Sequence, residues 1–181
     1  MSLNYADQVQ KVGTVTVSNP AVAVNISLGW VPRYTKVYSI NNLVESTRFS
    51  TMAAGYCIDS VNSASTQQVI NAAGGIADYA GRAAGGAVTG TVTVTAASAA
   101  VVGSSTNFVG ELAVGDKITV NGEVKIILSI TDSTHLTTTV PFIAAASTVS
   151  LYDMTGKTAG FTIGTDIMDT AADVVHWVAF R

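Results

Sequence analysis

Few side chains in this chain could act as a nucleophile, a base or a soft metal ligand. The 181 residues include two histidines, His135 and His176, and one cysteine, Cys57. Nucleophilic catalysis needs a base beside the nucleophile and a third group that orients the base. Neither histidine lies in a motif of that kind. We therefore expect His176, between Val175 and Trp177, to be a buried structural histidine and His135 to lie at the surface.

The cysteine and the aspartates near the C-terminus do not change this expectation. A single cysteine cannot form a disulfide or a cysteine-based zinc site within the chain, and Cys57 is typical of a small core residue. Asp166, Asp169 and Asp173 in TDIMDTAAD could bind Ca²⁺, but their spacing does not match an EF-hand. Turn capping is the interpretation we favour. The sequence thus predicts no enzymatic activity, no cofactor and no metal ion.

Aromatic residues in the first part of the chain are the remaining candidates for ligand binding. Trp30, Tyr34, Tyr38 and Tyr56 could stack against sugar rings. Packing in a core or an interface explains the same residues, and it is the interpretation we favour.

The composition narrows the class of protein. Hydrophobic residues make up 48% of the chain and charged residues only 12%, about half the usual charged share. Two interpretations stay open: a neutral, Thr-rich solvent face, or a surface covered by copies of the chain or by a partner. A net charge of −3 with scattered basic residues argues against nucleic-acid binding. No long apolar segment predicts a membrane span or an export signal, so we expect folding in a cytoplasm.

Alternating apolar and polar residues predict short antiparallel strands and an all-β fold. We expect a jelly-roll-like or related antiparallel β-sandwich from residues 1–85 and 156–181, with a small β-barrel or sandwich module, 86–155, inserted in it. Asn121-Gly122 is the strongest hairpin signal, because a type I′ turn needs positive φ at both positions. For 62–85 a strand and loop are favoured over a short helix. The main predicted strands are 21–28, 34–40, 43–49, 55–61, 88–96, 101–102, 116–120, 124–131, 136–139, 149–152, 161–163 and 174–180.

The two ends of the chain differ in character. Residues 1–11 are polar and without periodicity, which indicates an extended arm or a tail. The last predicted strand, VVHWVAF at 174–180, is apolar on both faces. Such a strand is either central in a sandwich or part of a subunit interface.

Three segments resemble parts of small structural proteins of tailed bacteriophages. They are WVPRYTKVYSINN with MAAGYCIDSV, the ending GFTIGTDIMDTAADVVHWVAFR, and the insert from GTVTVT to DSTHLT. The resemblance implies a virion component, above all a capsid decoration (cement) protein. Such proteins often form trimers on the capsid surface and brace neighbouring major capsid proteins.

The resemblance also implies where this chain makes its contacts. We expect the last strand and the strand at 34–40 to pack within a homotrimer, the arm to lie on the major capsid protein, and the insert to project outward. The expected interface residues are Val174, His176, Trp177, Val178, Phe180, Tyr34 and Tyr38, and the expected arm contacts are Leu3, Asn4, Tyr5 and Val9.

Other functions remain as alternatives at this point. A head-fibre or tail-fibre adhesin would bind host glycan through Trp30 and the neighbouring tyrosines. A tail or neck subunit would assemble into a ring of six or more copies. A small hydrolase is the most remote alternative.

Overall fold

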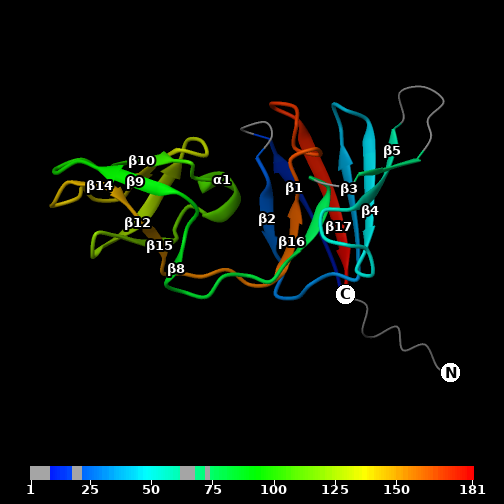
Figure 1. The fold of residues 1–181 in the computed structure, drawn as a ribbon, viewed down its shortest axis with the longest axis horizontal. Helices are drawn as coiled ribbons and strands as arrows, with labels where there is room; N and C mark the ends of the chain where they lie inside the picture. The colour runs from blue at the N-terminus through cyan, green and yellow to red at the C-terminus, as the bar shows by residue number, and fades with distance from the viewer. Residues whose placement is uncertain (1–8, 18–21, 62–67, 72–73) are drawn as a thin grey trace. The chain divides into compact units, whose positions relative to one another are not determined.

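The computed structural model describes residues 9–17, 22–61, 68–71 and 74–181, and these residues form an all-β fold, as predicted (Figure 1). The chain divides into two compact units: unit 1 is Met1–Ala80 with Ala159–Arg181, and unit 2 is Gly81–Thr158. The boundaries predicted from the sequence, 85/86 and 155/156, differ from these by a few residues. Unit 2 is thus continuous in sequence, whereas unit 1 consists of two segments.

Unit 1 is a sandwich of two antiparallel sheets. In Figure 1, β17 (red) lies in one layer with β3 and β4, and β2 and β16 lie in the other. The six-stranded sheet has the order β1 (Gln10–Thr16), β17 (Val174–Phe180), β3 (Tyr34–Ser39), β4 (Val44–Phe49), β5 (Cys57–Val61) and β6 (Gln68–Asn71). The three-stranded sheet has the order β2 (Val24–Ser27), β16 (Gly160–Ile163) and β7 (Ile76–Tyr79).

The core of unit 1 follows from the period-two alternation of its strands. Val37 on β3 and Val175 on β17 point inward and meet Phe161 and Ile163 of β16. Close approach of β16 to β2 requires a glycine, because a Cβ on Gly160 would lie 1.8 Å from the Ile26 carbonyl oxygen. Both segments of unit 1 therefore contribute to one core.

Unit 2 is a single open sheet of eight strands around its own core. Strands from both ends of the sheet contribute to this core, so the sheet curves. A closed barrel was one predicted alternative, but in the described residues the sheet stays open. A four-residue helix, α1 (Phe108–Glu111), packs Phe108 into the core. The strand order is β14 (Ala146–Val149), β9 (Thr91–Val94), β10 (Ala100–Ser104), β13 (His135–Thr138), β12 (Glu123–Ile130), β11 (Lys117–Val120), β15 (Leu151–Asp153) and β8 (Gly86–Ala87).

The two ends of unit 2 lie side by side, as an insertion requires. The backbones of Arg82 and Lys157 exchange hydrogen bonds of 2.9 and 2.7 Å. The Arg82 guanidinium pairs with Glu111 at 2.6 Å and with the fully buried Asp153 at 2.9 Å. Lys157 pairs with Asp116 at 2.5 Å. Ion pairs therefore hold the start and the end of the unit together.

Several local predictions can now be compared with the structure. Asn121 and Gly122 have φ of 47° and 80° between β11 and β12, which confirms the predicted hairpin. The helix considered for 62–85 is wrong for the described residues, because 68–71 and 76–79 are strands. The arm boundary is also wrong, since Gln10 and Lys11 belong to β1, where they pair with Phe180 and Ala179 of β17.

Candidate functional site

The outer face of the six-stranded sheet gathers most of the predicted interface residues. The register aligns Tyr34 with Phe180, Lys36 with Val178 and Tyr38 with His176 on neighbouring strands. Val12 on β1 and Phe49 on β4 extend the same face, and they are 67% and 47% exposed. We call this surface, with Val174 included, the outer face.

Aromatic side chains form one end of the outer face. The Tyr34 ring lies 5.2 Å from the Phe49 ring and 5.6 Å from the Phe180 ring, both in tilted geometry. Three strands thus contribute to one aromatic cluster, which orders these side chains before any partner binds.

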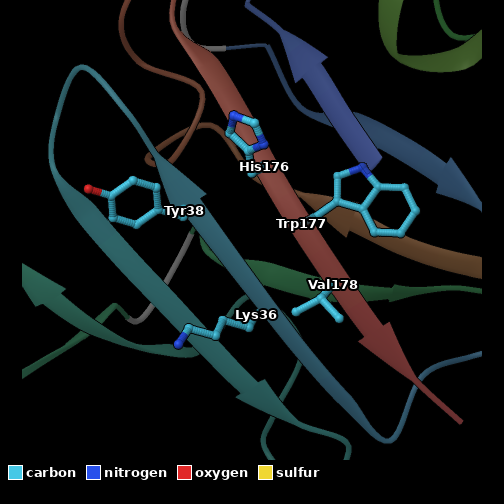
Figure 2. Close-up of a pocket in the computed structure, with 5 residues that line it drawn as sticks. All are labelled: Lys36, Tyr38, His176, Trp177 and Val178. Carbon is cyan, nitrogen blue, oxygen red and sulfur yellow. The ribbon is translucent and has the colours of Figure 1, made fainter. Parts of the chain in front are cut away.

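A shallow hollow of about 220 Å³ lies beside this cluster, lined by Lys36, Tyr38, His176, Trp177 and Val178 (Figure 2). Lys36 forms an ion pair of 2.8 Å with Glu45. The hydrogen bond to this carboxylate raises the pKa of Lys36 above its ordinary value. The outer face therefore holds one internally neutralised ion pair among apolar, aromatic and uncharged polar side chains, the last including Thr14 and Thr47.

Two predictions for β17 need correction. His176 is exposed rather than buried, because the three-stranded sheet covers only the opposite face of this strand. Trp177 borders the hollow, but its ring does not belong to the outer face: Figure 2 shows the ring turned away from Lys36 and Tyr38. The ring lies over Gly13 and makes an edge contact of 5.5 Å with Phe161. Trp177 is thus a core residue rather than an interface residue of the outer face.

The aromatic residues considered for sugar stacking do not form one platform. Trp30 packs against the core, whereas Tyr34 and Tyr38 lie on the outer face of β3. Tyr56 precedes β5 and is 37% exposed. Their separation leaves the arrangement without the joint surface that a sugar ring would need.

A second, polar pocket of about 80 Å³ lies inside unit 1. Three carboxylates line it: Asp59 from β5, and Asp166 and Asp169 from the loop that follows β16. The Ser46 hydroxyl of β4 also lines it, together with Val44 and Ile167. We call it the aspartate pocket.

The predicted capping role holds for two of the loop aspartates. Asp173 is fully buried, accepts a hydrogen bond of 2.9 Å from the Asn41 backbone N–H, and accepts another from the Ser39 hydroxyl. Asp169 accepts a hydrogen bond of 2.5 Å from the Asn42 side chain. Within the described residues, no three His, Cys, Asp or Glu side chains are arranged to hold a metal ion.

The sequence analysis missed Asp59, although the signal was present. Cys57 is a core residue, as predicted, and Asp59 lies two residues later on the same face of the strand. The Cys57 thiol donates to the Asp59 carboxylate at 3.1 Å. Burial, and then this carboxylate, raise the pKa of Cys57 to about 12, so the thiol is not a nucleophile at neutral pH.

His135 is exposed, as predicted, and stabilises a turn. Its Nδ1 lies 3.0 Å from Asp132, which also accepts hydrogen bonds from the backbone N–H groups of Thr134 and His135. These contacts, that of Thr134 first, lower the pKa of Asp132 to about 2.

Comparison with protein-family models, with curated proteins and with solved structures finds no match for this chain. In the part of the chain that the structure describes, no helix has the length and apolarity to cross a membrane.

Proposed function

We propose that this protein is a non-enzymatic structural subunit of a tailed-bacteriophage virion, a capsid decoration protein that forms a homotrimer through the outer face. The observation that carries the proposal is an ordered sheet face, with an aromatic cluster at one end, that the three-stranded sheet of unit 1 leaves uncovered. Its one ion pair, Lys36 with Glu45, is already satisfied within the chain. Such a face can be buried against another copy without leaving an unpaired charge.

The sequence resemblance supplies the virion part of the proposal. On this basis the partner is the major capsid protein, and the trimer braces neighbouring copies of it at the capsid surface. The proposed arm contacts Leu3, Asn4 and Tyr5 lie outside the described residues. Val9 is 37% exposed, and its carbonyl oxygen accepts a hydrogen bond of 3.1 Å from the Arg181 N–H.

Native mass tests the self-association. We expect a trimer by light scattering on a sizing column, and a monomer for Val12→Glu combined with Phe49→Glu, because both side chains are exposed on the outer face. Leu128→Glu is the matched control, since Leu128 is 57% exposed but lies in unit 2. A wild-type monomer, or a double variant that keeps the trimer, would contradict the proposed interface.

Capsid binding tests the arm separately. Removal of residues 1–8 leaves β1 intact and should abolish sedimentation with capsids, while the native mass stays that of the trimer. Unchanged sedimentation would exclude the arm as the capsid contact. A ring of six or more copies would instead favour the tail or neck subunit.

A further inference from the structure

The carboxylates of this protein fall into two groups. Eleven of the twelve acidic residues lie in the described part of the chain, and seven of them pair there with a basic side chain. The other four have no such ion pair, and all four belong to one region of unit 1: Asp59, Asp166, Asp169 and Asp173. Three of them come from one loop, TDIMDTAAD, and Asp59 comes from β5.

Asp173 is explained by its two hydrogen bonds, but the other three aspartates line the aspartate pocket together. Like charges that line one small pocket repel each other, and Asp59 is half-buried there while Asp166 and Asp169 are exposed. A cation in the pocket would remove this cost. The described residues of the chain provide none there.

Ser46 gives independent evidence that the pocket is built for a polar ligand. Ser46 is 1% exposed, and its Oγ makes no hydrogen bond of normal geometry to a nitrogen or oxygen in the described structure; the Cys57 thiol, a weak hydrogen-bonding group, interacts with it. Buried hydroxyls in proteins are normally hydrogen-bonded, because an unpaired one costs about 1–3 kcal/mol. A donor group in the pocket would satisfy this oxygen.

The geometry favours an ammonium group over a metal ion. A metal would need several carboxylates around one point, and the described residues offer no such arrangement. A primary ammonium donates three N–H groups from one nitrogen, and two carboxylates with one hydroxyl are sufficient to accept them. One water needs about 10–15 Å³ of such a cavity. The 80 Å³ of this pocket therefore accommodates an ammonium group and part of an alkyl stem.

We propose that the aspartate pocket binds a primary alkylammonium group, such as a lysine side chain of a partner protein or a free alkylamine. The ammonium donates to Asp59 and Asp166 and to the Ser46 hydroxyl. Val44 and Ile167, the apolar part of the lining, contact the alkyl stem. The outer face takes no part in this site, so the inference stands apart from the self-association proposed above.

The test titrates the full-length protein with Nα-acetyl-lysine N-methylamide, followed by the backbone NMR signals of Ser46, Asp59 and Ile167. We expect saturable shifts, and none with the uncharged analogue Nα-acetyl-norleucine N-methylamide. Asp59→Asn and Asp166→Asn should each weaken binding about tenfold, the loss expected for one charge-assisted hydrogen bond. Glu45→Gln, which removes a carboxylate of the outer face, should leave the affinity unchanged.

Butylamine distinguishes the two sources of the amine. Tighter binding of the lysine derivative indicates a lysine of a partner protein, and tighter binding of butylamine indicates a free amine. Asp166 is exposed, so Asp166→Asn provides a folded variant even if Asp59→Asn does not fold. Absence of saturation, equal shifts with the norleucine analogue, or saturation of the same signals by Ca²⁺ at lower concentration would overturn the proposal.

Discussion

The two units of this protein differ in how their carboxylates are paired, although unit 1 has ion pairs of its own at Lys36–Glu45 and Arg48–Asp78. In unit 2 every described carboxylate pairs with a basic side chain, including Asp153, which is fully buried against Arg82. In unit 1 four aspartates gather without any ion pair. Removing one partner of a buried ion pair leaves an uncompensated charge, whereas the unpaired aspartates of unit 1 are the groups that the proposed ammonium site uses. The comparison therefore separates carboxylates held by ion pairs from carboxylates left for a ligand.

The largest expected effect is at the ion pairs of unit 2. Arg82→Ala leaves the buried Asp153 without its partner and should lower the free energy of unfolding by about 3–5 kcal/mol. Loss of hydrogen-exchange protection in β11 and β15 measures it. Arg33→Ala, an exposed arginine of unit 1, is the control and should change little. An equal loss of protection in both variants would contradict the structural role of the Arg82 pairs.

Asp173 tests whether all four aspartates of unit 1 are alike. It is buried and accepts hydrogen bonds from Ser39 and the Asn41 N–H, so Asp173→Asn should lower the free energy of unfolding by about 1–3 kcal/mol. Urea unfolding followed by tryptophan fluorescence reports on unit 1, because Trp30 and Trp177 both lie there. If Asp173→Asn leaves the free energy of unfolding unchanged, Asp173 belongs with the three pocket aspartates.

Asp166 should respond with the opposite sign. Without a ligand, Asp166→Asn removes repulsion in the aspartate pocket and should raise the free energy of unfolding by about 0.5 kcal/mol. The same urea experiment measures it, with Glu45→Gln as the control that breaks an exposed ion pair instead. A clear loss of stability in Asp166→Asn would show that its carboxylate is needed by the fold.

Regular alternation made most of the strands predictable from the sequence. The last strand was placed at its observed bounds, 174–180, and the Asn121-Gly122 hairpin follows from a turn type that few residues allow. The environment of His176 was wrong, because alternation shows which residues share a face but not whether a second layer covers that face. The pocket at Asp59 and Asp166 was missed for a similar reason. Residues more than a hundred positions apart line that pocket together only once the fold brings β5 and the loop after β16 to it.

The smallest expected effect at neutral pH is at Glu123, a half-buried carboxylate of unit 2. Its carboxylate accepts hydrogen bonds from the backbone N–H groups of Ile143 and Ala144 at 2.9 Å, and these, with Lys125, lower its pKa to about 2. Because the pKa is lower in the folded state, the stabilisation is complete above about pH 4.5 and disappears as the pH falls through about 2. Unfolding by urea between about pH 5 and pH 2 should therefore show less loss of stability in Glu123→Gln than in the wild type. Asp132 will keep part of the dependence in that variant, since its pKa is also lowered to about 2. If the two curves run parallel, the carboxylate does not hold the loop at 143–144, and the charged contacts of unit 2 stabilise only its interior.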